Sequence, residues 1–238
     1  MKCLFIVPTI MTRPQFEINN VENIAKTFPK SDVVFVSNID DLDFKNYIPK
    51  YKNIKKRISG KLYSISKALN TGLKELTNHQ YISFIQSDMI ISKDVIQFCK
   101  KIVDDDLKCG VVGVRSHSTF NMFNKLIKRY DNIDLYRVLW SDGIMFWSKK
   151  LYDTIGDFDE IYLGDKESQD YCYRAHQYGY HNYYFRPSGD MLTKHNSLPF
   201  EQKTKYNSND FMNVVHNTKN IFRKKWEQWE KNQKHLFV

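Results

Sequence analysis

Acidic side chains gather in one short segment, GDFDEIYLGDKESQDYCYR, which spans residues 156–174. Aromatic and apolar residues interrupt the acids, which is unusual for a simple solvated face. A carboxylate held against aromatic rings loses hydration, and its pKa rises toward the range of a general base. Glu167 and Asp170 are the candidates for this role. The structural alternative is that both acids complement the dipole at the start of a helix, which Ser168 caps and Gly179 ends.

Asp88 follows an apolar segment, YISFIQSD, that has the character of a buried strand. A carboxylate at a strand end suits a hard cation, since Mg²⁺ and Mn²⁺ favour oxygen ligands and bridge to substrate phosphates. The alternative is an aspartate that caps a turn or helix, because the next residues lead toward a helix. Taken alone, this single carboxylate fits the capping role better.

His195 lies in a polar stretch, GDMLTKHNS, after the last strand-like segment. A lone histidine more often has a structural or exposed role than a ligand role. An imidazole and a carboxylate could nevertheless complete an octahedral site together with diphosphate oxygens and water. Asp88 and His195 are therefore candidate ligands for Mn²⁺ or Mg²⁺.

Alternating strand-like and helix-like segments would position these residues. Continuous apolar runs predict buried strands, and apolar residues at helical spacing predict helices between them. The expected strands cover 3–10, 32–38, 81–88 and 109–115, and residues 142–156 form a strand that passes into a short helix. The expected helices cover 15–28, 62–76 and 93–103. This order predicts an α/β fold with a mostly parallel sheet, flanked by helices and binding ligands at the carboxyl ends of its strands.

The pattern changes after about residue 200, which separates a main domain, 1–200, from a basic C-terminal helical extension, 201–238. The extension holds eight Lys or Arg and four Asp or Glu. Packing on the main domain is the favoured interpretation of its apolar helical face, and contact of 219–238 with a membrane surface is the alternative. The residues of this face are Ile221, Phe222, Trp226 and Trp229.

The composition favours a soluble, cytoplasmic protein. No segment approaches the run of about 18 uncharged apolar residues that a membrane span requires. The four cysteines are scattered without metal-type spacing, which is typical of a reducing compartment. The net charge of +9 is concentrated in residues 45–67, which hold eight Lys or Arg and no acid. Such a stretch attracts the phosphates of a sugar nucleotide, a nucleic acid or a lipid surface, or it is an ordinary solvated loop.

Taken in order, these segments resemble the family 2 inverting glycosyltransferases, which have the nucleotide-sugar-binding GT-A fold. The resemblance covers roughly residues 2–198. FIVPTIMTRP and DVVFVSNIDD resemble the first two strands of that family with their nucleotide loops, GKLYSISKALNTGLKEL its glycine-to-asparagine helix, and FIQSDMIIS its metal-binding strand end. Residues 141–180 resemble its acceptor-side block, and KHNS its distal metal histidine. No single piece is specific, but their common order is strong evidence.

Two positions depart from the family pattern. The metal motif is usually Asp-x-Asp, and here Gln86 holds its first position. Rhamnosyltransferase-like relatives manage with Asn-x-Asp, which implies weaker metal binding here rather than none. The Glu-Asp-x-Asp block begins at Glu167 and has Ser168 where the family often places its catalytic base. Serine accepts a proton poorly at neutral pH. We favour Glu167 as the base, with Asp170 or Asp165 as the alternative.

The resemblance implies metal-assisted transfer of a hexosyl or deoxyhexosyl group, with inversion, from a nucleotide-diphosphate donor to an acceptor hydroxyl. It implies that Asp88 and His195 hold Mn²⁺ or Mg²⁺ on the diphosphate. The residues implied in nucleotide-sugar binding are Thr9, Arg13, Asn38, Asp40, Lys67, Ser87 and Asp88. Those implied in the acceptor or sugar pocket are Trp140, Asp142 and Gly143, and Trp147 is a further candidate that core packing explains equally well.

The sequence specifies neither the donor sugar nor the acceptor, for which a glycan, a glycoprotein or a lipid-linked molecule is the first interpretation. Transfer to a modified base in DNA is the alternative among enzymes, because residues 45–67 and the basic extension would guide nucleic acid. Nucleic acid is nonetheless the weaker candidate partner. The alternative from another class is a catalytically inactive nucleic-acid or membrane-surface binder with the same fold, which Gln86 and Ser168 would explain.

Overall fold

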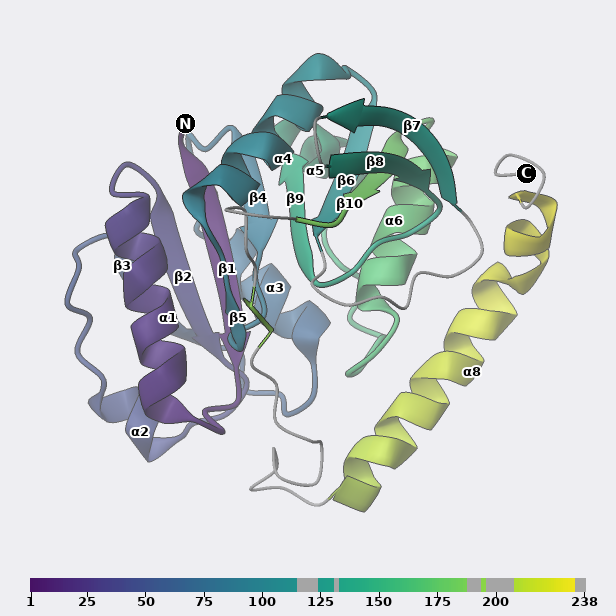
Figure 1. The fold of residues 1–238 in the computed structure, drawn as a ribbon. Helices are drawn as coiled ribbons and strands as arrows, with labels where there is room; N and C mark the ends of the chain where they lie inside the picture. Colours follow the sequence, from purple (N-terminus) through teal and green to yellow (C-terminus); the bar gives the residue numbers. More distant parts are fainter. Residues whose placement is uncertain (115–123, 131–132, 188–193, 196–207, 234–238) are drawn as a thin grey trace.

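A nine-stranded sheet forms the centre of the molecule within its described residues, 1–114, 124–130, 133–187, 194–195 and 208–233 of this computed structural model (Figure 1). Its strands are β1 (Cys3–Thr9), β2 (Asp32–Ser37), β3 (Ile54–Ile58), β4 (Tyr81–Phe84), β6 (Cys109–Val114), β7 (Asn124–Tyr130), β8 (Ile133–Val138), β9 (Ile144–Ser148) and β10 (His181–Phe185). Two short strands, β5 (Met89–Ile90) and β11 (Lys194–His195), pair with each other. The helices are α1 (Pro14–Thr27), α2 (Leu42–Asn46), α3 (Ile65–Leu73), α4 (Lys93–Asp105), α5 (Lys149–Ile155), α6 (Glu167–Gln177) and α8 (Ser208–Gln233).

The sheet is parallel in one half and mixed in the other. Its strand order is β3-β2-β1-β4-β9-β6-β10-β8-β7. Strands β2, β1 and β4 are parallel, as the sequence predicts, and β3, which the sequence analysis does not predict, is parallel to β2. Strand β9 is antiparallel to both β4 and β6, and β8 is antiparallel to both β10 and β7. β7 and β8 follow each other closely in the chain, and such a short connection permits only antiparallel pairing.

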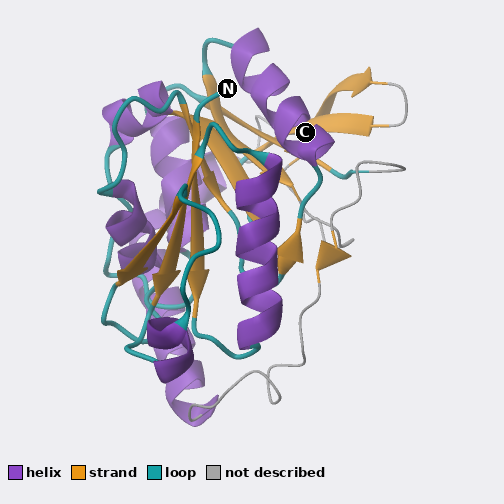
Figure 2. Cartoon of the chain, turned by 90° about the vertical axis from the view of Figure 1, so that its left-hand side faces the viewer, coloured by secondary structure: helices purple, strands orange, loops and turns teal. Residues whose placement is uncertain are grey.

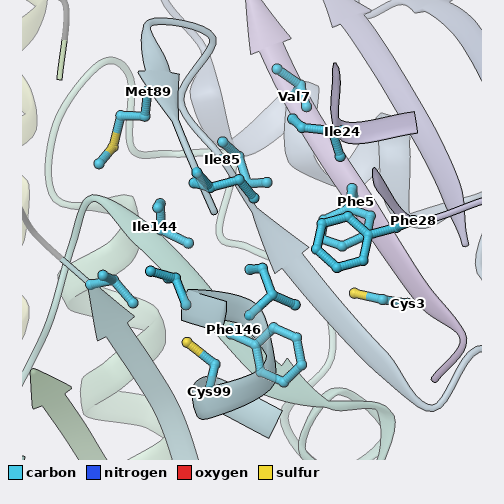
Figure 3. Close-up of a cluster of buried hydrophobic side chains, with 14 of the residues drawn as sticks. Cys3, Phe5, Val7, Ile24, Phe28, Ile85, Met89, Cys99, Ile144 and Phe146 are labelled. Carbon is cyan, nitrogen blue, oxygen red and sulfur yellow. The ribbon is translucent and has the colours of Figure 1, made fainter. Parts of the chain in front are cut away.

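Buried side chains alternate between the two faces of the central strands, because successive residues of a strand point to opposite sides. In β1, Phe5 and Val7 belong to one core layer, whereas Leu4 and Ile6 belong to the other. Helices α1 and α4 contribute to the first layer, and α3, α5 and α6 to the second. Figure 2 shows helices on both sides of the sheet. Figure 3 shows the first layer, where Phe5 packs on Phe28 with their ring centroids 4.9 Å apart.

Helix α3 lies so close to β1 that one of its positions requires glycine. A Cβ atom built on Gly72 would lie 2.5 Å from Cγ2 of Ile6. We expect Gly72→Ala to lower the free energy of unfolding by about 1–3 kcal/mol, because overpacking forces neighbouring atoms to move. The double variant Gly72→Ala/Ile6→Ala should lose less free energy of unfolding than the sum of the losses in the two single variants.

Urea unfolding measures this effect, with Lys74→Ala as the control. Lys74 is exposed at the end of the same helix, so its replacement should change the free energy of unfolding by less than about 0.5 kcal/mol. Strict additivity of Gly72→Ala and Ile6→Ala would contradict the proposed clash.

Two predicted helix boundaries are wrong. The helix expected over 62–76 begins only at Ile65, because the side chain of Ser64 caps it by accepting a hydrogen bond from the Lys67 amide at 3.2 Å. Ser168 does not cap α6. Instead Lys166 occupies the N-cap, with a left-handed φ of +72°, and its carbonyl accepts a hydrogen bond from the Asp170 amide at 2.8 Å, so that the helix begins at Glu167.

The C-terminal extension contains a long helix, α8, that packs on the main domain. Phe222 and Trp226 are buried against Tyr162 and Tyr173. Figure 1 shows α8 beside α6. The aromatic face of the extension is therefore a packing surface, and its buried rings do not face a membrane. Among the described helices, none is both long and apolar enough to cross a bilayer.

Candidate active site

The carboxyl ends of β1 and β2 bring two of the candidate nucleotide residues together. Thr9 is the last residue of β1, and its carbonyl accepts a hydrogen bond from the Asn38 amide at 3.0 Å. Both side chains are buried. The Asn38 side chain also lies within hydrogen-bond distance of Ser59, with Oδ1 and Oγ 3.3 Å apart. Asp40, in contrast, is exposed and forms an ion pair with Lys45 at 2.7 Å.

A buried carboxylate, Glu17, organises the loop that follows β1. It accepts hydrogen bonds from the Thr9 hydroxyl, from the Thr12 hydroxyl at 3.0 Å and from the Arg13 amide at 3.1 Å. Met11, in the middle of this loop, has a left-handed φ of +55°, which is uncommon outside glycine and clusters at functional sites. The guanidinium of Arg13 lies 4.5 Å from the centre of the Phe16 ring. The loop is thus held in one conformation by the start of α1.

The segment that carries Asp88 is fixed by a second side chain of α1. The Asn20 amide donates hydrogen bonds to the carbonyls of Ser87 at 3.1 Å and Met89 at 2.8 Å. Strand β5 begins at Met89, and its pairing with β11 places the backbone of His195 directly opposite Met89. Asp88 and His195, which are far apart in sequence, therefore lie on adjoining pieces of backbone.

This arrangement fits a divalent cation that is held partly by the substrate. The described residues contain no group of three or more His, Cys, Asp or Glu side chains that could hold a metal ion. One carboxylate in the turn between β4 and β5, with the backbone of a histidine beside it, is a sparse donor set of the right chemistry for Mn²⁺ or Mg²⁺. Diphosphate oxygens and water would have to supply the remaining ligands.

Replacing Asn20 should release the Asp88 segment. We expect Asn20→Leu to lower the free energy of unfolding by about 1–3 kcal/mol, because two carbonyls lose their hydrogen-bond donor in a buried place. Asn19→Leu is the matched control, since Asn19 is exposed and only accepts a hydrogen bond from Gln15. Urea unfolding of both variants compares them, and equal losses would show that the Asn20 hydrogen bonds do not matter.

Lys67 lies in the first turn of α3, a helix that also holds the acceptor-side block. Asn70 donates to the Phe158 carbonyl at 2.9 Å and accepts from the Phe158 amide at 2.9 Å. The Ser66 hydroxyl donates to the Tyr162 carbonyl at 3.2 Å. Lys67 is thus anchored on the same helix as the contacts that fix residues 158–162.

Glu167 is a buried carboxylate at the start of α6. Only 7% of the residue is exposed, and its Oε2 atom has no hydrogen-bond partner among the described residues. Burial raises the pKa of Glu167 to about 7, with smaller increases from Asp165 and Asp142, whereas a backbone hydrogen bond and Lys166 lower it. A carboxyl group with this pKa exchanges protons near neutral pH.

Asp170 is also buried, but its carboxylate is fully engaged. Oδ2 accepts a hydrogen bond from Arg174 Nε at 2.9 Å. Oδ1 accepts from Lys225 Nζ and from Trp226 Nε1, both at 2.8 Å. Asp165 is half-buried and faces Lys219, whose Nζ lies 3.8 Å from its carboxylate. Of the three candidate bases, Glu167 alone combines burial with an oxygen that has no partner in the described part of the chain.

The connection from β8 to β9 carries the remaining candidates. Gly143 adopts a left-handed φ of +79° and bridges to Val114 at the end of β6. The neighbouring Asp142 is half-buried and lies near enough to Glu167 to raise its pKa. Trp140 is half-buried between two core clusters. Trp147 is fully buried, with its ring centroid 5.5 Å from that of Tyr171, so it belongs to the core.

Much of the basic stretch 45–67 is already paired within the fold. Glu75 accepts a hydrogen bond from Lys55 at 3.0 Å and from Arg57 Nε at 2.7 Å. Lys56 donates to the carbonyls of Lys45 and Tyr47 at 3.0 and 2.6 Å. The charge that the sequence concentrates here is therefore partly neutralised.

Sequence reasoning missed Glu17 and Asn20, the two side chains that hold the loop after β1 and the Asp88 segment. A signal was present, because both lie on the inward face of α1, on which Val21 and Ile24 are also buried. A polar residue within the apolar stripe of a helix has to find a buried partner.

Comparison with known proteins relates the chain to others through its fold. No protein-family model matches the sequence, and no curated protein matches it either. Among solved structures, residues 1–349 of S. aureus TarS superpose with a TM-score of 0.58 at 18% identity, over 96% of this chain and 73% of that one.

Two further structures show the same likeness. GalNAc-T7 with UDP, GalNAc and Mn²⁺ gives a TM-score of 0.64 at 10% identity, over 92% of this chain and 48% of that one. Drosophila β1,4-galactosyltransferase 7 with xylobiose gives a TM-score of 0.54 at 12% identity, over 90% of this chain and 79% of that one. This chain thus spans less than half of the GalNAc-T7 chain. Such distant similarity shows architecture alone, and the architecture of this chain is the GT-A glycosyltransferase fold.

Proposed function

We propose that this protein transfers a sugar from a nucleotide-diphosphate donor to an acceptor hydroxyl. The observation that carries the proposal is Glu167, a buried carboxyl group with a pKa of about 7 and an oxygen that lacks a partner among the described residues, on a GT-A fold. A base of this pKa is suited to remove a proton from a sugar hydroxyl at neutral pH.

Glu167 carries the proton step. It accepts the proton of the acceptor hydroxyl as that oxygen bonds to the anomeric carbon, and the bond from the anomeric carbon to the diphosphate oxygen breaks. The nucleoside diphosphate leaves with the bonding electrons, through an oxocarbenium-like state, and in-line attack inverts the anomeric centre. Asp170 takes no part in the proton transfer in this proposal, because three donors occupy its carboxylate.

The donor binds at the carboxyl ends of β1, β2 and β4. Thr9, Asn38 and Ser87 line this edge, with Arg13 and Lys67 as cationic groups for the diphosphate and Asp40 at the exposed rim. Asp88 and His195 are the residues that would hold Mn²⁺ or Mg²⁺. When bound, such an ion would offset the charge that develops on the leaving diphosphate. Asp142, Gly143 and Trp140 are the candidates for the acceptor side, where Asp142 lies near enough to Glu167 to raise its pKa.

Known complexes of the structural neighbours suggest which donors to test first. S. aureus TarS was solved with UDP-GlcNAc, and Drosophila β1,4-galactosyltransferase 7 with manganese and UDP-Gal. The Gln86-x-Asp88 motif resembles the rhamnosyltransferase-like variant, so deoxyhexose donors belong in the same panel. Nucleic acid is the weaker candidate acceptor, because Glu75 already pairs with Lys55 and Arg57 of the basic stretch that would attract it.

The test is release of nucleoside diphosphate from UDP-, GDP- and dTDP-sugars, with an acceptor mixture, in Mn²⁺ or in chelator. We expect nucleoside diphosphate to be released from one donor, and we expect this release to increase with Mn²⁺. Asp40→Ala serves as a control variant. Because Asp40 is exposed, its replacement should change only the affinity for the donor. If the folded protein released no nucleoside diphosphate from any donor of the panel, that result would count against the proposed function.

A further inference from the structure

Helix α8 contacts much of the loop that precedes Glu167, residues 159–166. The Thr218 hydroxyl donates to the Leu163 carbonyl at 2.8 Å and accepts from the Leu163 amide at 3.2 Å, so one side chain satisfies both backbone groups of a loop residue. About two turns earlier on this helix, the Phe211 ring lies where a Cβ on Gly164 would meet it at 3.0 Å. These contacts fix the backbone that leads into α6.

A second set of contacts joins α8 to α6 itself. The carboxylate of Asp170 is fully buried and accepts from Trp226 and Lys225 on α8 and from Arg174 on α6. Trp226 also packs edge-on against Tyr173, with ring centroids 5.4 Å apart. Asp170 lies one helical turn after Glu167, so this tie holds the first turn of α6.

The backbone between these two sets of contacts is strained. Lys166 has a left-handed φ of +72°, although it has a side chain, and it directly precedes Glu167. Such a conformation persists where the surroundings over-determine it, and it is frequent at functional sites. Here α8 supplies those surroundings, since Lys219 lies 3.8 Å from Asp165 as well.

We propose that α8 is a positioning element of the active site, in which Thr218 and Trp226 hold loop 159–166 and the first turn of α6 so that Glu167 meets the acceptor hydroxyl. The proposal rests on the proposed function of Glu167 as the base. It assigns to Asp170 the role of a tie between two helices. None of these residues is a catalytic residue, because each acts through Glu167.

Thr218→Val and Trp226→Phe test this role, because each removes hydrogen bonds and keeps most of the side-chain volume. We expect kcat to fall by about tenfold or more, since small misplacements of a catalytic group are costly, while KM for the donor changes by less than about twofold. Lys224→Ala is the matched control on the same helix. Lys224 is exposed, and its replacement should leave both constants unchanged.

The pH profile separates positioning from a general loss of folded protein. A displaced Glu167 is better hydrated, so the acidic limb of the kcat profile should move to lower pH in Trp226→Phe. The charged groups that face Glu167, namely Asp165, Lys166 and Asp142, are the same in both proteins. A smaller folded fraction would scale kcat without moving this limb.

Hydrogen exchange of the amides in 159–166 gives a readout that needs no turnover. Faster exchange there in Thr218→Val and Trp226→Phe, with other regions unchanged, is the expected result. If the wild-type protein turns over no donor, the proposed function fails while exchange still decides whether α8 holds the loop. Unchanged exchange in 159–166, or a normal kcat in both variants of an active protein, would overturn the positioning role.

Discussion

Glu167→Gln is expected to lower kcat by a factor of about 10²–10⁴ and to leave KM for the donor nearly unchanged. Glutamine keeps the size of the side chain but cannot accept the proton of the acceptor hydroxyl. The residues proposed to bind the donor lie on other elements, so donor binding should survive the change. Steady-state release of nucleoside diphosphate in the presence of acceptor measures both constants.

Asp165→Asn is the matched control for this result. Asp165 is two residues away and half-buried, and its carboxylate faces Lys219 and Lys166. We expect its replacement to change kcat by less than about tenfold. A large loss in Asp165→Asn with a small loss in Glu167→Gln would move the base to Asp165, and our assignment would be wrong.

The activity of the wild-type protein should depend on pH through the same group. Only the carboxylate form of Glu167 accepts a proton, and burial raises its pKa to about 7. We therefore expect kcat to rise as the pH increases from about 6 to 8. This acidic limb should be missing from the residual activity of Glu167→Gln.

As the pH rises, the stability of the protein should fall while its activity increases. The folded pKa of Glu167, about 7, lies above its usual value of 4.5, so the fold favours the protonated carboxyl group. Its contribution to stability is fully present below pH 4.5 and is lost as the pH rises through 7. Glu167→Gln should thus raise the free energy of unfolding at pH 8 by on the order of 1–3 kcal/mol, and by little at pH 4. A variant that is less active and more stable at pH 8 is typical of a group retained for function.

The parallel half of the fold could be predicted because its strands are buried on both faces. Runs such as 3–10 and 32–38 are continuously apolar, which is the signature of strands covered by helices on both sides. The hairpin of β7 and β8 was missed, since NKLIKRY has few apolar residues and its side chains are largely exposed. Strand β3 was hidden for a similar reason, because its Lys55 and Arg57 are charged and pair with Glu75, which lies in the turn after α3.

The candidate site could be predicted where the chemistry is local, and not where it depends on contacts between distant segments. Glu167 was recognisable, because an acid among aromatic residues at a helix start implies burial. The engagement of Asp170 depends on Lys225 and Trp226, which lie more than fifty positions further along the chain. Near Asp170 in the sequence, only Arg174, four positions later on the same helix, indicates one of its three donors.

Asp88→Ala should abolish turnover, with a loss of about 10³-fold or more, because Asp88 is the one carboxylate of the segment 86–88 and Gln86 cannot replace it as a charged ligand. Losing a cation that neutralises a leaving diphosphate costs several kcal/mol in the transition state. Binding of Mn²⁺ in the presence of nucleoside diphosphate, followed by electron paramagnetic resonance, gives a readout that is independent of turnover. We expect that signal to weaken in Asp88→Ala and to persist in Glu167→Gln.

The contrast between these two variants tests the division of labour in the proposed site. Asp88 and the backbone of His195 lie beside β5, whereas Glu167 starts α6 on the proposed acceptor side. The variants Asp88→Ala and Glu167→Gln should therefore lose different properties. Asp88→Ala should lose the Mn²⁺ signal and retain the pH dependence of folding stability that Glu167 causes, and Glu167→Gln should do the reverse. If both variants lost the Mn²⁺ signal, the two groups would share one site, and Glu167 would be a ligand rather than a base.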